Sequence, residues 1–382
     1  MRSEFLPFSR PSITEDDVTA VTEVLRSGWL TSGPQAAAFE KAFAEYLGCP
    51  GAVSLSSATA GMQVLLRALN IGPGDEVITP SLTWVSTVNV IALADATPVF
   101  VDVDRETLIS TIEDIRQAIT PRTKLILPVH FAGSAADSDA LIRLSEETGI
   151  SVVEDAAQAL GTHYQGRPVG QRGSTLFSFH PLKSITTGEG GMFCSDDPEL
   201  LDRVRHLKYN GLGKNVMDDK TQGRAPHVEV LEPGFSYNLP DMAAALGLRQ
   251  LARLEMHIRK RTQLAQHYRQ GLADIEEILP IADTPCCTRH GWQLFVVRLD
   301  IDRAGMTRSA FMDAMKARNI GMGLHFRPIH LHKYYAENMD SWPGKLPHTE
   351  WNAERVCSLP LFTDMILDDV DHVIEAIKDV LA

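Results

Sequence analysis

The sequence predicts an α/β fold, in which a large domain with a mainly parallel, seven-stranded sheet precedes a smaller α+β domain. Short apolar runs alternate with helical patterns or long connections through roughly the first half of the chain, a pattern typical of parallel sheets. Helices and strands continue beyond that half without repeats or low-complexity tracts. We place the domain boundary after residue 245, which gives domains of residues 1–245 and 246–382, the second including the linking helix.

The N-terminal segment is predicted to hold two helices. Thr14 caps the first helix, with Asp17 three residues later, and an apolar stripe continues until Gly28 ends the helix. Residues 28–34 then form a loop, and Pro34 starts the next helix.

The predicted strands are short apolar runs separated by helical patterns or connections. They lie at residues 52–55, 76–79, 98–101, 124–127, 151–154, 175–178 and 191–194. From Lys214 to Pro233 the sequence is polar and irregular, which predicts a long surface loop of the kind used for binding or subunit contact.

The C-terminal part is predicted to begin with one long helix, which the turn Asn238–Asp241 introduces and which runs to about Gln270. Further strands and helices are shorter. We expect strands near Gln293–Leu299 and Gly321–His325, and helices at Arg308–Arg318 and Asp369–Leu381.

Composition and charge argue against several classes of protein. The net charge of −13 disfavours broad nucleic-acid or membrane binding, which need basic surfaces. No window approaches the ~20 apolar residues that cross a bilayer, and the first residues lack the apolar core of a signal peptide. Five cysteines without CxxC spacing favour neither a disulfide framework nor zinc. We therefore expect a cytoplasmic protein without a metal site.

The most informative stretch surrounds Lys183, which follows the strand ending at Ser178 and precedes the glycine-rich turn at residues 188–191. This position is the end of a strand, where α/β folds build their sites. A lone loop lysine is more often a solvated charge. Here the strand at residues 151–154 leads into Asp155, so an amine and a carboxylate follow neighbouring strands. That pair suggests pyridoxal phosphate, which needs a lysine for its aldehyde and an acid for its ring nitrogen.

A second group of small and hydroxylated residues follows the first predicted strand. Residues 56–62 lie at the start of a helix, where free N–H groups and the helix dipole favour an anion. A simple capped helix is the alternative. Together with Lys183, the stretch predicts a phosphate cradle. Ala58 and Thr59 would supply amides, and Thr59 and Ser178 would supply hydroxyls.

The side chains expected around the cofactor ring also follow strands. Asp155 would hydrogen-bond the pyridinium nitrogen, although a helix N-cap is the simpler role. Gln158, three residues later, would hydrogen-bond the phenolic oxygen. Trp84 would stack on the ring, although most tryptophans serve packing. Lys183 would bind the aldehyde and, once displaced by a substrate amine, act as the general base that moves a proton between carbon atoms.

Other chemistries lack their motifs. No G-x-G-x-x-G follows a strand, and neither G-x-x-x-x-G-K-[ST] nor G-x-S-x-G occurs. His325, His330 and His332 cluster without a standard metal-ligand spacing. The sequence therefore favours pyridoxal phosphate over a nicotinamide cofactor, a serine hydrolase or a metal.

With these motifs in this order, the chain resembles the DegT/DnrJ/EryC1/StrS sugar aminotransferases along essentially its whole length. The resemblance rests on Ser56–Gly61, Glu154–Gln158, Ser178–Gly191 and Asn238–Asp241. It implies the fold type I architecture of aspartate aminotransferase, with pyridoxal 5′-phosphate as cofactor. Within the family, the likeness is greatest to the enzymes that make UDP-4-amino-4-deoxy-L-arabinose. That closer likeness lies in residues 5–11, 79–87, 223–226, 323–327, 333–335 and 357–362.

The resemblance also implies a homodimer whose active sites are shared between the subunits. Asn238 would reach the phosphate of the partner's cofactor, and Arg224 with its loop would contribute across the interface. Thr31 would line the sugar pocket, and His325 would touch the substrate. Gln158 stands where other members carry histidine, and either side chain can hydrogen-bond the ring oxygen.

The activity that the resemblance implies is transfer of an amino group from L-glutamate to C4 of a nucleotide-linked 4-keto sugar, with release of 2-oxoglutarate. The closer likeness implies that the substrate is a UDP-4-keto-pentose, which is converted to UDP-4-amino-4-deoxy-L-arabinose for lipid A modification. One alternative is another pyridoxal phosphate reaction, such as dehydration or amination of a different UDP-, dTDP- or GDP-linked keto sugar. Another is a non-enzymatic regulatory or scaffold protein that kept the fold. Because relatives with histidine in place of the lysine are dehydratases, Lys183 favours transamination.

Overall fold

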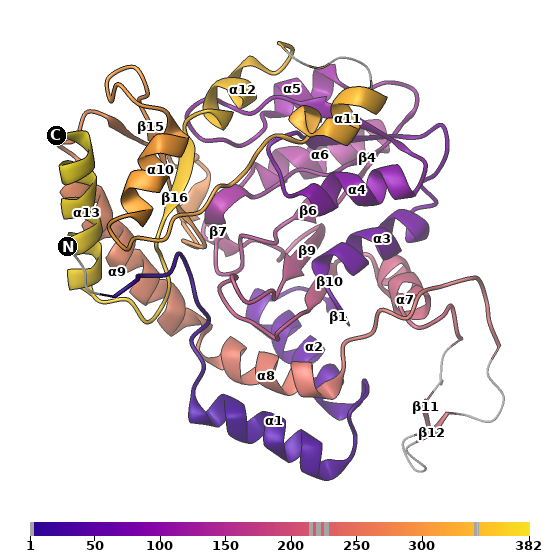
Figure 1. Ribbon diagram of the computed structural model, residues 1–382. Coiled ribbons are helices and arrows are strands. Elements are labelled where there is room, and N and C mark those ends of the chain that lie inside the picture. The colour runs from indigo at the N-terminus through magenta and orange to yellow at the C-terminus, as the bar shows by residue number, and fades with distance from the viewer. Residues whose placement is uncertain (1–3, 214–216, 219–222, 225–228, 340–341, 343) are drawn as a thin grey trace.

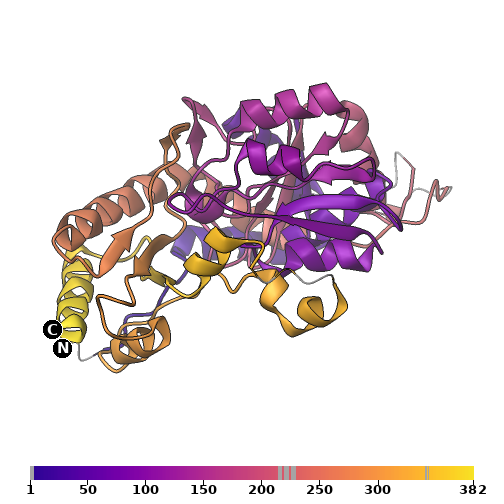
Figure 2. The same cartoon turned by 90° about the horizontal axis from the view of Figure 1, so that it is seen from above.

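The chain folds into a large region built around strands and a smaller region rich in helices, which lie side by side in Figures 1 and 2. The computed structural model describes residues 4–213, 217–218, 223–224, 229–339, 342 and 344–382. No described helix is both long and apolar enough to span a membrane.

The strands of the large region form two adjoining groups. In the first, β3 (Thr97–Val101), β2 (Glu76–Pro80), β4 (Thr123–Ile126) and β5 (Ser151–Val152) are parallel. In the second, β6 (Glu154–Asp155) is parallel to β9 (Ser174–Ser178), whereas β10 (Gly191–Ser195) is antiparallel to β9 and to β1 (Gly51–Leu55).

The α/β class with a parallel sheet is confirmed, and every predicted run in the first part of the chain contains a strand. The run at residues 151–154 is interrupted at Val153, so the described residues form two four-stranded sheets instead of one with seven. The interruption is local, because the Val153 N–H still donates to the Ile126 carbonyl over 3.1 Å.

Helices cover both faces of the second sheet. On one side lie α2 (Pro34–Leu47) and α8 (Asp241–Ala252), and on the other lie α3 (Ala58–Ala68) and α7 (Pro198–Leu207). Leu176 and Phe177 are consecutive in β9 and belong to different hydrophobic cores. The centre of the strand is therefore apolar on both faces, as expected of a strand that is covered on both sides. Around the first sheet lie α4 (Val85–Leu93), α5 (Ile112–Gln117) and α6 (Ser138–Thr148).

The predicted N-terminal helices are present. In α1 (Glu15–Ser27), the Asp17 carboxylate accepts the Thr14 N–H over 2.8 Å, and Gly28 ends the helix with φ 76°. Pro34 is the first residue of α2. The buried Asp241 carboxylate accepts the N–H groups of the N-cap residue Gly33 and of Gln35 and Ala36 in the first turn, over 2.7–3.1 Å. This carboxylate joins the start of α8 to the start of α2.

The smaller region packs three helices on a three-stranded antiparallel sheet. The helices are α9 (Leu254–Leu272), α10 (Arg308–Lys316) and α13 (Leu367–Leu381), and the strands β13 (Ile278–Pro280), β15 (Phe295–Leu299) and β16 (Val356–Leu359). Short elements complete the described chain. They are β7 (His163–Tyr164), β8 (Arg167–Pro168), β11 (Met217–Asp218), β12 (Gly223–Arg224), β14 (Cys287–Arg289), α11 (Lys333–Asn338), α12 (Pro347–Ala353) and two 3₁₀ turns, η1 (Phe131–Gly133) and η2 (Ile329–Leu331).

Two predictions for the C-terminal part are wrong. The single long helix is divided at Arg253, because α8 packs on α1 and α2 while α9 packs on α13, and one straight helix cannot serve both regions. The strand at Gly321–His325 does not form, because Gly321 bonds to Leu6 and Gly323 to Ser358, each as an isolated bridge or bond. Strands β13 and β16 had no counterpart in the prediction. The domain boundary after residue 245, which falls inside α8, stays a prediction.

We predict that Asp241→Asn lowers the free energy of unfolding by about 2 kcal/mol, because a charged acceptor for three amides is lost. Urea unfolding followed by circular dichroism measures the change. Asp16→Asn is the matched control, since Asp16 is an exposed acid in the first turn of α1. Equal stabilities of the two variants would contradict the role given to Asp241.

Candidate active site

A cavity of about 300 Å³ lies where β1, β6 and β9 end, and Lys183 borders it. Eight of the side chains expected from the sequence border the same cavity. They are Ala58, Thr59, Trp84, Asp155, Gln158, Ser178, Lys183 and His325. Residues distant in the sequence therefore meet at one edge of the sheet, as the strand order requires.

One end of the cavity is formed by the start of α3. The Ser57 hydroxyl caps this helix by accepting the Ala60 N–H over 3.0 Å. The amides of Ala58 and Thr59 lie in the first turn, where the helix itself supplies no acceptor. A Cβ on Gly191 would lie 2.7 Å from the Ala58 nitrogen, so only glycine allows β10 to approach this turn. Such a cradle of backbone amides suits a phosphate group.

The wall of the cavity also holds a buried carboxylate. Asp155 ends β6 and is 4% exposed. It accepts hydrogen bonds from the Thr87 hydroxyl and the Ala157 N–H, both over 3.1 Å. Burial raises the pKa of Asp155, whereas the Ala157 amide, the Lys183 charge and the Thr87 hydroxyl act in the opposite direction. A carboxylate held in this way can accept a hydrogen bond from a protonated ring nitrogen.

A buried pair of side chains, His130 and Glu154, holds the main chain at Asp155 in place. The Nδ1 atom of His130 accepts the Ala136 N–H over 3.0 Å, so its Nε2–H donates to Glu154 over 2.6 Å. The main-chain N–H of His130 donates to the Asp155 carbonyl over 3.0 Å. Both side chains are fully or almost fully buried. The pair therefore fixes the backbone from which the Asp155 carboxylate projects.

The orientation of the Gln158 amide follows from its backbone partner. Its Oε1 accepts the Ala132 N–H over 2.7 Å, which leaves the Nε2 group as the available donor. Gln158 is 7% exposed and borders the cavity. A donor at this position suits an anionic oxygen on a bound ring, the role expected of it.

Lys183 lies in the turn between β9 and β10. Its N–H donates to the His180 carbonyl over 2.8 Å, and the Gln293 side chain donates to the Leu182 carbonyl over 2.8 Å. Burial lowers the pKa of Lys183 to about 8, and the nearby Asp155 carboxylate partly opposes this shift. A substantial fraction of the amine is therefore neutral near physiological pH and able to act as a nucleophile.

Two rings flank the cavity. Trp84 precedes α4 and is 58% exposed, with its ring centroid 5.8 Å from that of Phe326. His325 contacts the Ser358 hydroxyl through Nδ1 over 2.9 Å. Burial and the Lys183 charge lower the pKa of His325 to about 4, so its imidazole is neutral at physiological pH. An exposed indole face and a neutral imidazole are therefore available to a bound molecule.

Two expected residues, Thr31 and Asn238, do not border this cavity, and a third cannot be placed. The exposed Thr31 offers its carbonyl to the Asp241 N–H over 3.2 Å. Asn238 donates its side-chain amide to the Ser32 hydroxyl over 2.8 Å. Arg224 lies in β12, but its side chain falls outside the described part of the structure. Thr31 and Asn238 thus belong to one loop assembly, separate from the Lys183 cavity of the same chain.

Sequence reasoning did not identify Thr87, the His130–Glu154 pair or Gln293. Thr87 follows Trp84 by three residues, so a hydroxyl one helical turn beyond an expected ring-stacking residue was the available signal. His130 and Gln293 come from segments without a recognisable motif. Their roles become visible only when the fold brings them against Asp155 and Leu182.

A half-buried lysine, a buried aspartate and an amide cradle around one cavity at strand ends define a pyridoxal phosphate enzyme on an α/β fold. The chain belongs to the DegT/DnrJ/EryC1/StrS aminotransferase family, whose model matches residues 11–378. It is therefore an enzyme, a sugar aminotransferase with the fold type I architecture, and its cofactor is pyridoxal phosphate.

Three solved structures illustrate the likeness. DesV of S. venezuelae is 33% identical, with 99% of each chain covered and a TM-score of 0.89. Spr1654 of Streptococcus pneumoniae, assigned as a sugar aminotransferase and solved in PLP and PMP forms, is 31% identical, with 99% of this chain and 98% of that chain covered and a TM-score of 0.89. PseC of Helicobacter pylori, an aminotransferase involved in the biosynthesis of pseudoaminic acid, is 26% identical, with 99% of each chain covered and a TM-score of 0.91.

We predict that the rate at which the cofactor-free protein binds pyridoxal phosphate rises with pH and reaches half of its maximum near pH 8. The neutral amine is the reactive form, and the pKa of Lys183 is lowered to about 8. Asp155→Asn should move the midpoint to lower pH, because it removes a charge that favours the lysine cation. The visible absorption of the bound cofactor follows the reaction.

Lys41→Met serves as the control for this titration, since Lys41 is an exposed lysine on α2. Its profile should match that of the unmodified protein. A midpoint above pH 10 in the unmodified protein would show that Lys183 titrates like an exposed lysine.

Proposed function

We propose that the enzyme transfers the amino group of L-glutamate to C4 of a nucleotide-linked 4-keto sugar and releases 2-oxoglutarate. The substrate that we propose is the UDP-4-keto-pentose, which gives UDP-4-amino-4-deoxy-L-arabinose for lipid A modification and antibiotic resistance. The observation that carries transamination is that Lys183 and Asp155 border one cavity, with the pKa of the lysine amine lowered to about 8. The sugar assignment rests on the sequence likeness in segments such as residues 79–87 and 323–327.

Each residue around the cavity has a defined task in this proposal. Bound pyridoxal phosphate supplies an electron sink for negative charge that develops on a substrate carbon. Lys183 holds the aldehyde and then carries the proton between carbon atoms. Asp155 keeps the ring nitrogen protonated, and Gln158 donates to the ring oxygen. The amides of Ala58 and Thr59 with the hydroxyl of Ser178 hold the phosphate.

The remaining wall would orient the two substrates. Trp84 offers an exposed indole face against which the cofactor ring stacks. His325 contacts the sugar as a neutral imidazole, because its lowered pKa prevents it from becoming a second cation beside Lys183. Neutrality at this position leaves Lys183 as the group that moves protons.

We further propose that the enzyme is a cytoplasmic homodimer in which each subunit completes the other's active site. Asn238 would bind the phosphate of the partner's cofactor, Thr31 would line the sugar pocket and Arg224 would contribute across the interface. In support, Thr31 and Asn238 lie away from the cavity of their own chain and are joined through Ser32 and Asp241. Two such loops related by a two-fold axis would each face the other subunit.

The alternative proposal is a different keto sugar linked to UDP, dTDP or GDP, or a dehydratase of the same family. DesV and PseC are about equally similar in fold although PseC serves pseudoaminic acid biosynthesis, so the fold alone does not select a sugar. Lys183 favours transamination over dehydration for every sugar.

We predict that, in a panel of UDP-, dTDP- and GDP-linked 4-keto sugars with L-glutamate, the UDP-4-keto-pentose gives the highest kcat/KM. Release of 2-oxoglutarate is the measurement. Lys183→Ala should lose turnover and the visible absorption of the bound cofactor, while circular dichroism shows that it remains folded. A Lys183→Ala variant with full turnover would falsify the mechanism. A preference for a dTDP or GDP sugar would replace the substrate and leave the mechanism intact.

We also predict that two inactive variants complement each other. Lys183→Ala and Asn238→Ala chains, unfolded and refolded together, should recover roughly a quarter of the native activity, because half of the dimers are mixed and each contains one complete site. Each variant refolded alone is the control. Absence of recovery, with mixed dimers demonstrated by mass spectrometry, would rule out sites shared through Asn238.

A further inference from the structure

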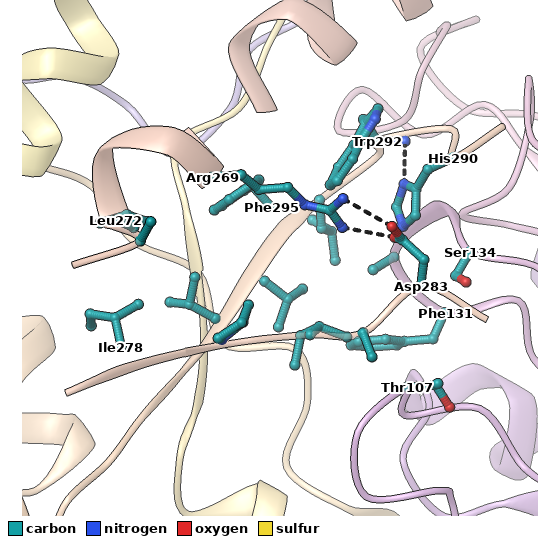
Figure 3. Close-up of a pocket in the computed structure, with 18 residues that line it drawn as sticks. Thr107, Phe131, Ser134, Arg269, Leu272, Ile278, Asp283, His290, Trp292 and Phe295 are labelled. Atoms are coloured by element: carbon teal, nitrogen blue, oxygen red, sulfur yellow. Dashed lines mark hydrogen bonds and ion pairs between the residues drawn. The ribbon is translucent and has the colours of Figure 1, made fainter. Parts of the chain in front are cut away.

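A second cavity, of about 530 Å³, lies between the large and smaller regions, apart from the Lys183 cavity (Figure 3). Its walls are mainly apolar and come from α9, β13, β15 and the segment around Phe131. In Figure 3, Leu272 and Ile278 lie at one end, whereas Arg269, Asp283 and His290 gather towards the other. The volume is in the range of sites for small organic ligands, and no role in transamination involves this cavity.

The charged groups of the cavity neutralise each other. The Arg269 guanidinium forms two hydrogen bonds to the Asp283 carboxylate, over 2.8 and 2.9 Å. It also lies over the Trp292 ring, 4.7 Å from its centroid. A charged ligand would have to compete with this pair or enter an apolar space without a counter-ion, which is unfavourable. The cavity therefore suits an uncharged ligand.

His290 supplies the polar feature that can orient such a ligand. Its Nδ1 accepts the Trp292 N–H over 2.9 Å, so the neutral ring carries its proton on Nε2. Burial lowers the pKa of His290 to about 4, which keeps the ring neutral at physiological pH. The ring thus offers one donor at the polar end of an apolar cavity, and a hydroxyl or carbonyl oxygen is the complementary group.

The second cavity shares a wall with the Lys183 cavity. Ala132 borders the second cavity, and its N–H donates to Gln158 of the catalytic cavity over 2.7 Å. Trp292 and Leu294 border the second cavity, whereas Gln293 between them borders the catalytic one. The Gln293 side chain donates to the carbonyl of Leu182, the neighbour of Lys183. A ligand on one side therefore touches residues bonded to the other side.

The shared wall consists of a segment around Ala132 and a segment around Trp292, which are hydrogen-bonded to each other and have strained backbone conformations. Gly291 donates to the Gly133 carbonyl over 2.8 Å, and Leu294 donates to the Ala132 carbonyl over 3.2 Å. Ala132 and Trp292 both have left-handed backbone conformations, with φ 58° and φ 46°. Such conformations are unfavourable in residues other than glycine and gather at ligand sites and switch regions. A bound ligand could therefore change the conformation of this wall.

We propose that this cavity is a second binding site, which takes an uncharged, mainly apolar small molecule with one hydrogen-bond acceptor and alters cofactor binding through the shared wall. The acceptor faces His290, and the apolar body lies against Leu272, Ile278 and Phe295. A shift of Trp292 would move the adjacent Gln293, whose side chain donates to the Leu182 carbonyl. A shift of Ala132 would move Gln158, the donor to the ring oxygen, because the Ala132 N–H donates to its side chain. The site does not depend on which sugar the enzyme uses.

The test uses 2-naphthol as the probe, added to the holoenzyme and followed by isothermal titration calorimetry. Naphthalene-2-carboxylate, of similar shape but charged, should bind at least about tenfold more weakly. In Ala273→Phe, whose new ring would fill the cavity mouth, 2-naphthol affinity should fall by at least about tenfold. Ala317→Phe should bind like the unmodified enzyme, because Ala317 is also an exposed alanine at a helix end but does not border the cavity.

Coupling is tested by the dissociation constant of pyridoxal phosphate with and without saturating 2-naphthol. A change of about fivefold or more is expected, and the affinity for 2-naphthol should change by the same factor when the cofactor is removed. Circular dichroism confirms that Ala273→Phe is folded, and the comparison of the two probes on the unmodified enzyme needs no variant. Absence of 2-naphthol binding, equal binding by Ala273→Phe, or a cofactor affinity indifferent to the probe would each overturn the proposal.

Discussion

The placement of two opposite charges, largely shielded from solvent, beside one cavity at the ends of neighbouring strands is the constraint on which the site depends. Asp155 and Lys183 border one cavity, and burial shifts the pKa of each towards its neutral form while the partner acts against that shift. The carboxylate is kept ionisable by a hydroxyl and an amide, whereas the lysine has only the opposing charge. This asymmetry leaves the acid as a fixed acceptor and the amine as the group that changes protonation.

Much of the fold could be predicted because its determinants are local. The Thr14 and Gly28 caps, the apolar runs and the Pro34 helix start are short-range patterns, and the structure has elements at each of them. The errors arose where tertiary packing decides. The break at Arg253 follows from two different helix partners, and residues 321–325 divide their bonds between Leu6 and Ser358. No local signal marks either choice.

The site was predictable to the extent that its residues follow strands or begin helices. Lys183, Asp155 and the Ala58–Thr59 turn have such positions, and the fold places them around one cavity. The supporting groups were not predictable, because His130 and Gln293 act through main-chain carbonyls whose positions depend on the finished fold. The contribution of Thr31 and Asn238 to a second subunit stays a prediction from the family resemblance, because the fold of one chain does not place a second copy.

The hairpin geometry of the lysine segment has an evolutionary consequence. β9 and β10 are adjacent and antiparallel, with Ser178 opposite Gly191, so residues 179–190 leave the cavity edge and return to it. Gly191 is confined by the start of α3, and Ser178 by the ladder. Insertion or deletion of one residue would displace the lysine or break the approach to the helix. This segment is therefore constrained to one length, which an exchange of lysine for histidine preserves.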